Sequence, residues 1–392
     1  MDQPYSHIEN SMSFEPTVGY RQLREECPVH HVDDHDPPFF VVSRFADVVA
    51  TLKQPALWNN RDGPGVFYQE TGVLGTTDDP DHARHRAVLR RSFVPTNINS
   101  LEPTMTAFAD ELLDAMLPLG EGDFVPLFAA PLPAMAIGEL LGVRPGDRAM
   151  FHDLTSAVAS ALTGGDLVAY ARARDTLGDY IDELLAEREL QPDADLPDDV
   201  LTAMLHARQE GTLSGPEVRH LGHQLLIAGH ETTTSLLGMM LLRLLQHPDA
   251  MRRLRDDPSL IPAGIEEALR YDSPVNGLFR TNAESCDVHG VEIPPRSKLQ
   301  ILYASANRDP QQFPNPDEFI IDRPRSEVGR HVAFGWGIHF CIGAPLARLE
   351  AKVAFERLLA RTTTIELAGE PVRNESFVLH GLTSLPLRWT TV

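Results

Sequence analysis

The chain has 392 residues, 42% of them hydrophobic, and a formal net charge of −22. This length and composition allow a large buried core, while the negative charge disfavours nucleic acid or an anionic membrane as a partner. The three cysteines are odd in number and far apart, which argues against a disulfide framework and fits a reducing compartment. The N-terminus has no basic leader, and no apolar run approaches the ~18 residues of a membrane span, so we expect a cytoplasmic protein.

The first segments of the chain predict a small β-rich part. Residues 1–15 show no hydrophobic periodicity, and we expect a loose arm there. Phe39–Ser43 is typical of a short buried strand, and a helix is expected from Arg44 to about Lys53. Residues 59–79 contain several Gly and Pro residues, which predicts a long irregular loop, and such loops are often functional.

A basic segment follows at residues 81–91, within an otherwise acidic chain. His82 and Arg86 are four residues apart and would share one helix face, from which an arginine can bind a carboxylate through two hydrogen bonds. Arg84, Arg90 and Arg91 add further positive charge. A solvated basic helix face is the alternative interpretation.

Residues 100–190 predict helices that are interrupted by prolines, with the clearest break at residues 163–166. We expect the two helices on either side of this break to form a mobile lid over a pocket. Residues 191–199 are rich in Pro and Asp and predict a surface loop.

A long helix is expected from Ser214, a typical cap, to His247, where Pro248 ends the pattern. About 30 residues at 1.5 Å each would make a rod of roughly 45–50 Å. Its middle, residues 228–233, combines Gly, Glu and Thr, which are unfavourable inside a helix and indicate a functional site. A zinc-protease interpretation of His230-Glu231 fails because the residue at position 234 is threonine. A polar kink filled by water is the structural alternative.

The next helix, expected over residues 263–271, carries Glu267 and Arg270 three residues apart. This E-x-x-R pattern is weak by itself, because it recurs at Glu327 and Glu370 in this chain. Alternating apolar residues around Gly290 and at 299–302 then predict strands, and residues 381–389 end the chain with further strand patterns.

Cys341 lies in a glycine-rich segment just before a predicted helix with Pro345 in its first turn. A cysteine binds a metal as thiolate, and a helix N-terminus favours an anion. No second Cys or His stands at zinc spacing, so a lone thiolate here suits a haem axial ligand better than a zinc site. A buried free cysteine is the alternative.

The segment from Phe334 to Gly343 fits the pattern F-G-x-G-x-H-x-C-x-G and is followed by L-A-R. This strongly resembles the haem-binding loop of the cytochromes P-450, the haem-thiolate monooxygenases. The H-x-x-x-R, A-G-x-E-T and E-x-x-R patterns agree with that resemblance. It implies a mainly α fold with a smaller β-rich part, a single haem domain over residues 16–392, and haem b (iron protoporphyrin IX) as cofactor.

The resemblance also implies a role for each matching residue. Cys341 would be the proximal metal ligand, Phe334 would pack against the ligand side of the macrocycle, and Gly343 would belong to the same cofactor loop. Contacts with the haem propionates are expected from His82, Arg86, Arg280 and His339. Glu231 and Thr232 would be the catalytic acid and alcohol beside dioxygen. Glu267, Arg270 and Arg323 would form a structural salt bridge, and the apolar substrate pocket would include Ala228, Val275 and Leu278.

The implied reaction is insertion of one oxygen atom of O2 into an apolar small substrate, by hydroxylation or epoxidation. Electrons would come from NAD(P)H through a ferredoxin reductase and a ferredoxin, which would dock on Arg84, Arg90 and Arg91. A peroxide-driven peroxygenase and a non-catalytic haem sensor are the alternatives, and neither needs residues 228–232. Cys27 before Pro28 resembles a haem-sensing motif, but it lacks the glycine loop and the following helix.

Overall fold

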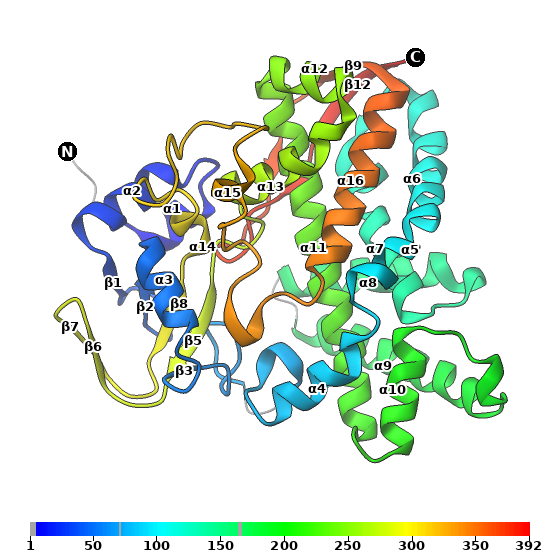
Figure 1. The fold of residues 1–392 in the computed structure, drawn as a ribbon, viewed down its shortest axis with the longest axis horizontal. Coiled ribbons are helices and arrows are strands. Elements are labelled where there is room, and N and C mark those ends of the chain that lie inside the picture. The colour runs from blue at the N-terminus through cyan, green and yellow to red at the C-terminus, as the bar shows by residue number, and fades with distance from the viewer. Residues whose placement is uncertain (1–4, 70–71, 164–166) are drawn as a thin grey trace.

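The computed structural model describes residues 5–69, 72–163 and 167–392. Helices fill one side of the molecule and a smaller β-rich part lies on the other (Figure 1). The predicted class, mainly α with a smaller β-rich part, is confirmed. The helices are α1 His7–Met12, α2 Thr17–Glu26, α3 Phe45–Leu52, α4 Asp81–Arg90, α5 Pro95–Ser100, α6 Glu102–Met116, α7 Pro131–Leu141, α8 Arg148–Thr163, α9 Leu167–Glu189, α10 Val200–Gln209, α11 Gly215–Gln246, α12 Pro248–Asp256, α13 Ile261–Tyr271, α14 Tyr303–Ala306, α15 Arg325–Val328 and α16 Ala344–Arg361.

The β-rich part is built around a five-stranded sheet in the order β1-β2-β8-β5-β3, and a second sheet has the order β4-β12-β9. β2 and β8 run parallel, whereas β5 pairs with β8 in the antiparallel direction. Every residue of β2 and β8 is buried, because these strands are covered on both faces. The strands are β1 Val29–Val32, β2 Phe39–Val42, β3 Trp58–Asn59, β4 Glu121–Asp123, β5 Leu278–Asn282, β6 Cys286–Val288, β7 Val291–Ile293, β8 Lys298–Ile301, β9 Thr362–Leu367, β10 Val372–Arg373, β11 Leu382–Ser384 and β12 Pro386–Thr391.

Helix α11 runs through the middle of the helical side (Figure 1). It begins with a reciprocal cap in which the Ser214 side chain accepts from Glu217 N and the Glu217 carboxylate accepts from Ser214 N. Length and composition would let this helix cross a membrane, but 72% of its most apolar window is buried inside the protein. It is therefore the core helix of the fold, as a helix that is hydrophobic on most sides must be.

The predicted loose arm is wrong for residues 5–15. This segment contains α1, whose His7 and Ser11 side chains are buried. His7 Nε2 lies 2.6 Å from Gln300 Oε1 on β8, and the Tyr20 hydroxyl donates to Ser11 Oγ at 3.1 Å. These anchors are polar, and one of them joins His7 to a residue 293 positions away, so no local hydrophobic pattern could have indicated them.

Other predicted elements agree with the structure within a few residues, including α3, α11 and α13. The predicted break at residues 163–166 separates α8 from α9, but residues 164–166 lie outside the described part of the chain. The mobile lid therefore stays a prediction.

Candidate active site

The loop that carries Cys341 joins α15 to α16 and turns sharply at two glycines. Gly335 and Gly337 have φ angles of +70° and +75°, the left-handed region that favours glycine. A Cβ on Gly337 would also come within 2.9 Å of the Leu52 carbonyl oxygen. Cys341 N then donates to Phe334 O at 2.9 Å, which closes the loop just before α16 begins. The glycines thus place the cysteine at the helix N-terminus, as the sequence predicts.

The Cys341 sulfur accepts from the backbone N–H groups of Gly343 and Ala344. Burial among protein atoms raises the pKa of the thiol, while these N–H groups and the nearby Arg86 and Arg348 act in the opposite direction. The side chain nevertheless keeps accessible surface, so a bound group can reach the sulfur. A metal ion deprotonates a thiol that coordinates it, so this sulfur suits a metal ligand.

Two histidines and an aspartate meet beside the cysteine loop. The rings of His82 on α4 and His339 have centroids 4.3 Å apart, and His339 Nε2 lies 3.3 Å from Asp78 Oδ1. Burial lowers the pKa of His339, with Arg280 and His82 acting in the same direction and Asp78 opposing them. Among the described residues, no group bonds to the buried His339 Nδ1. That nitrogen is thus available to a ligand.

Arg86 and Arg280 provide positive charge at the same place. Arg280 lies on β5, is buried, and donates to Phe279 O at 2.8 Å. Arg86 is half-buried on α4 and acts on the charge of Cys341. Within the described part of the chain neither arginine makes an ion pair, although most arginines of this protein do. Two guanidinium groups without counter-ions, next to an open thiol, fit a haem with its two carboxylates.

The centre of α11 presents a second set of predicted residues. Ala228 is exposed although most of this helix is buried. The Thr232 hydroxyl donates to Ala228 O at 2.7 Å, and Glu231 Oε1 lies 3.4 Å from His230 Nδ1. A Cβ on Gly229 would lie 3.3 Å from Ile137 of α7, so glycine permits close helix packing there. Glu231 and Thr232 are therefore two accessible polar side chains beside the exposed Ala228 on a core helix.

The other predicted pocket residues lie at the start of β5. Val275 and Leu278 are half-buried and pack against the hydrophobic cluster of the five-stranded sheet. Val275 also bridges to Leu379 in the C-terminal segment. Asp78 also belongs to the site, because it accepts from Asn60 N at 2.9 Å and contacts His339. This residue was missed in the sequence analysis. An acidic residue just before a helix would have been the signal.

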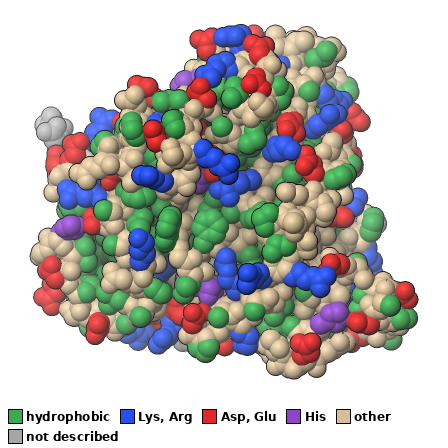
Figure 2. All heavy atoms as spheres, in the orientation of Figure 1, with side chains coloured by type: hydrophobic (Ala, Val, Ile, Leu, Met, Phe, Trp, Pro, Cys, Tyr) green, Lys and Arg blue, Asp and Glu red, His purple; other side chains and the backbone are tan. Residues whose placement is uncertain are grey.

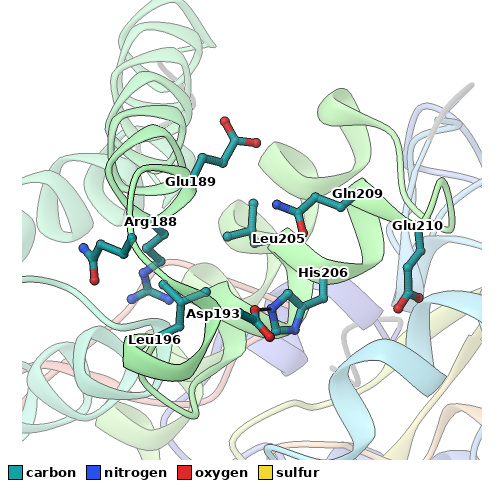
Figure 3. Close-up of a pocket in the computed structure, with 9 residues that line it drawn as sticks. Arg188, Glu189, Asp193, Leu196, Leu205, His206, Gln209 and Glu210 are labelled. Carbon is teal, nitrogen blue, oxygen red and sulfur yellow. Dashed lines mark hydrogen bonds and ion pairs between the residues drawn. The ribbon is translucent and has the colours of Figure 1, made fainter.

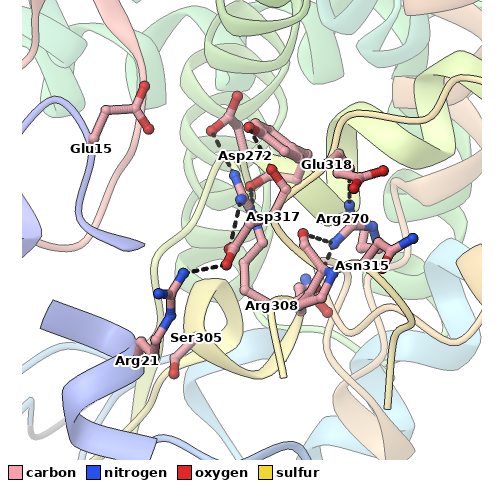
Figure 4. Close-up of polar contacts among 12 residues, drawn as sticks. Glu15, Arg21, Arg270, Asp272, Ser305, Arg308, Asn315, Asp317 and Glu318 are labelled. Atoms are coloured by element: carbon pink, nitrogen blue, oxygen red, sulfur yellow. Dashed lines mark hydrogen bonds and ion pairs between the residues drawn. The ribbon is translucent and has the colours of Figure 1, made fainter. Parts of the chain in front are cut away.

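The structure brings Glu267, Arg270 and Arg323 together in the interior. Arg270 Nη2 lies 2.7 Å from Glu267 Oε1 and Arg323 Nε lies 3.0 Å from Glu267 Oε2, with side chains at most 2% exposed. Arg270 also donates to the carbonyls of Asn307 and Pro316. It donates to the carbonyl of Glu318 as well, and both residues are labelled in Figure 4. Loss of one partner of such a buried pair costs about 3–5 kcal/mol. This network fixes the segment that leads to the cysteine loop.

The predicted basic patch is largely neutralised within the protein. Arg84 pairs with Asp81 at 2.8 Å and with Glu217 at 2.6 Å, and Arg91 pairs with Asp198 at 3.1 Å. Arg90 is exposed and makes no ion pair with a described residue. Two of the three predicted charges thus have internal partners, which the sequence could not reveal because Asp198 and Glu217 are more than 100 residues away.

Exposed aromatic rings lie next to Cys341 instead. Trp336 is 42% and Phe340 39% exposed, and Lys53 Nζ lies 5.9 Å from the centre of the Trp336 ring. Figure 2 shows Lys and Arg side chains around hydrophobic groups in the middle of this face. This face therefore combines apolar surface with positive charge.

A cavity of about 410 Å3 lies elsewhere, between the end of α9 and α10 (Figure 3). Most of its charged side chains are already paired, with His206 Nε2 2.6 Å from Asp193 Oδ1 and Arg188 held by Asp199. It contains no cysteine, and none of the predicted site residues lines it. We assign the chemistry to the Cys341 region.

Comparison with known proteins identifies the family. Residues 146–384 match the family model of cytochrome P-450. The chain is 41% identical to cytochrome P-450 107B1 of Saccharopolyspora erythraea, over 94% of each chain, and 37% identical to vitamin D(3) 25-hydroxylase of Pseudonocardia autotrophica, over 95% and 93%. The structure of the polyketide synthase cytochrome P-450 PksS of Bacillus subtilis superposes with a TM-score of 0.88 at 33% identity, covering 99% of this chain and 100% of that one.

The chain belongs to the cytochrome P-450 family and has its fold. It is an oxidoreductase that uses haem and incorporates oxygen from O2 into small organic substrates. The predicted family, enzyme class and cofactor are thereby confirmed, and the interpretation as a non-catalytic haem sensor is wrong.

Proposed function

We propose that this protein is a haem-thiolate monooxygenase that hydroxylates or epoxidises an apolar small molecule, with electrons delivered from NAD(P)H by a ferredoxin reductase and a ferredoxin. The observation that carries the proposal is the environment of Cys341, an accessible sulfur at a helix N-terminus that faces two N–H groups. When bound, haem supplies the redox chemistry at dioxygen. The relation to bacterial cytochromes P-450 and the formal net charge of −22, which disfavours an anionic membrane, support a cytoplasmic location.

In this proposal the surrounding side chains hold the cofactor. Cys341 is the metal ligand, Phe334 and Gly343 line its loop, and Arg348 lies 4.6 Å over the Phe334 ring and limits its movement. The propionate carboxylates are assigned to His82, Arg86, Arg280 and His339. This assignment is supported by two observations within the described residues: neither arginine makes an ion pair, and His339 Nδ1 has no hydrogen-bond partner. Charge-assisted bonds from these donors would fix the orientation of the macrocycle.

Thr232 and Glu231 are assigned to proton delivery. The Thr232 hydroxyl donates a hydrogen bond to Ala228 O, so its oxygen lone pairs remain free to accept from a water or from a protonated oxygen group. Glu231 is partly exposed and can exchange protons with solvent. Ala228, with no side chain beyond Cβ, leaves room for substrate beside them, and Val275 and Leu278 would add apolar surface.

Peroxide-driven turnover is the alternative, and a direct comparison separates the two. The purified protein is given a substrate that shifts its Soret band, either with NAD(P)H, reductase and ferredoxin or with hydrogen peroxide alone. We expect product to form with the electron-transfer chain at least as fast as with peroxide, because Glu231 and Thr232 serve dioxygen protonation. Efficient turnover with peroxide and none with the electron-transfer chain would contradict the monooxygenase assignment.

The face around Trp336 is proposed as the docking site of the ferredoxin. An acidic ferredoxin would be attracted by Lys53 and Arg90, which have no carboxylate partner among the described residues, and would cover the exposed Trp336 and Phe340 rings. The three arginines predicted from the sequence contribute unequally, because Arg84 and Arg91 are internally paired.

Charge reversal can test this docking site. We expect Arg90→Glu and Lys53→Glu to slow ferredoxin-dependent reduction severalfold at low salt and much less at high salt, since steering by charge is screened. Arg388→Glu makes the same change of two charges on strand β12, away from α4 and the cysteine loop (Figure 1), and is the control with a smaller expected effect. Equal rates in all variants at every ionic strength would favour a merely solvated helix face.

A further inference from the structure

Strand β8 carries a lysine in the interior of the protein. Lys298 is 0% exposed and lies in the middle strand of the five-stranded sheet. Its partners across the sheet are Phe39 on β2 and Thr281 on β5. A lysine is almost never buried completely unless its charge is paired, so the contacts of this ammonium group are informative.

The ammonium group holds residues 60–69, which we call the entry segment. Lys298 Nζ donates to Asp62 O at 2.8 Å and to Gly63 O at 3.0 Å. It also lies 4.9 Å from the centre of the Tyr68 ring, whose hydroxyl donates to Arg296 O at 2.6 Å. Gly63 has a φ of +81°, so only a glycine readily makes the turn that brings both carbonyls to one nitrogen. The position of the entry segment therefore depends on Lys298.

These contacts leave the charge of Lys298 without a bonded anion. Within the described residues, Nζ bonds only to neutral carbonyl oxygens. The Asp62 carboxylate lies 3.6 Å from Arg296 instead, and Arg280 adds a second positive charge nearby. Burying an unpaired ammonium group costs much more free energy than burying a neutral amine, because the charged form loses more solvation. Accordingly, burial lowers the pKa of Lys298 to about 8, with Asp62 opposing and Arg280 adding to the shift.

We propose that Lys298 couples the position of the entry segment to proton binding, so that the segment packs against β8 more tightly when Lys298 is neutral. When the segment lifts, water reaches the amine and its pKa returns toward about 10.4. Closing then releases a proton, and the closed state is favoured as pH rises between these two values. A neutral amine still has two N–H donors for the two carbonyls, so both hydrogen bonds persist.

The far end of the same loop connects to the candidate active site. Asn60 N donates to Asp78, which contacts His339, and Gly75 N donates to Gln224 on α11 at 3.1 Å. Gln224 is one helical turn before Ala228. The entry segment thus shares a closed loop with residues beside the pocket. We expect release of the entry segment to speed substrate exchange at lower pH, and this expectation rests on the proposed function. The coupling of the segment to proton binding does not rest on it.

Titration of Lys298 can be observed directly, because the chain has only three lysines, Lys53, Lys298 and Lys352. We would label lysine side chains at Cε with 13C and follow their NMR signals in the haem-loaded protein from about pH 6 to about pH 11. One signal, absent from Lys298→Arg, should titrate at least one pH unit below that of the exposed Lys53. A Lys298 signal that titrates with or above that of Lys53 would overturn the proposal.

Amide hydrogen exchange measures the segment itself. After correction for intrinsic exchange, protection of the entry segment should rise roughly tenfold or more from about pH 7 to about pH 9.5, while α6 serves as the unchanging reference. Tyr68→Phe should keep the rise, because the tyrosine does not titrate in this range. Lys298→Arg cannot lose its proton and Lys298→Met has none to lose, so the protection of the entry segment should not change with pH in either variant.

A flat profile in the wild type, or a rise that persists in Lys298→Arg, would overturn the coupling. The reduced carbon-monoxide spectrum reports on the thiolate site separately. A failure of the proposed function is therefore distinguishable from a failure of the Lys298 coupling. If a variant does not fold, the pH dependence of protection in the wild type decides whether the coupling exists.

Discussion

Replacement of Thr232 by alanine should separate oxygen consumption from product formation. Oxygen insertion requires protons at dioxygen, and a general acid must lie within about 2.6–3.2 Å of the reacting atom or one water away. The Thr232 hydroxyl is suited to hold such a water because it donates its own hydrogen bond to Ala228 O at 2.7 Å and its lone pairs stay free to accept. Alanine is the better helix former, so α11 should stay intact. The ratio of product to NAD(P)H consumed should fall about tenfold while hydrogen peroxide accumulates.

Thr234 provides a matched control two residues further along the same helix. Its hydroxyl also donates to the carbonyl four residues earlier, His230 O at 3.0 Å, but the side chain is buried. Thr234→Ala should therefore leave the product ratio unchanged. Glu231→Gln should instead slow the whole cycle, because proton supply from solvent fails. An unchanged ratio in Thr232→Ala would mean that Thr232 is a structural residue and that protons arrive by another route.

Cys341→Ser should abolish the thiolate signature and with it monooxygenase activity. A serine hydroxyl is a far weaker acid than a thiol, so Gly343 N, Ala344 N and the nearby Arg86 could not hold it as an anion near neutral pH. The reduced carbon-monoxide complex should lose its strongly red-shifted Soret band, and activity should fall by at least about a thousandfold, the loss expected when a group essential to the chemistry is removed.

The other two cysteines supply the controls for this variant. Cys27 and Cys286 are half-buried free thiols outside the cysteine loop, and Cys27 Sγ donates to Val29 O. Cys27→Ser and Cys286→Ser should keep the red-shifted band. Survival of that band in Cys341→Ser, together with its loss in Cys27→Ser, would move the thiolate ligand to residue 27.

The cysteine loop was predictable because its geometry is local. Gly335 and Gly337 adopt positive φ angles within a few residues of Cys341, and the helix that follows starts where Pro345 indicates. The same holds for α11, where the Ser214 cap and Pro248 set both ends. Signals of this kind lie within one or two turns of the backbone, so the order of residues alone expresses them.

The misjudged features all depend on partners far away in sequence. The arm at residues 5–15 is ordered by Gln300, and the charge of Arg91 is met by Asp198. Lys298 was not singled out in the sequence analysis either, and its ammonium group donates to Asp62 O and Gly63 O, 235 or more residues away. Charge pairing and burial are properties of the folded chain and not of a segment.

The sequence by itself therefore determined the family, the cofactor and the long core helix, and it singled out Cys341 as the proposed ligand, because each depends on residues at short fixed spacing. Only the tertiary structure decided which charges are free to meet a partner, which polar side chains are buried, and what holds the loop at residues 60–69. The physical reason is that hydrogen bonds and ion pairs act over a few ångströms in space, and the fold alone sets which distant residues come within that range.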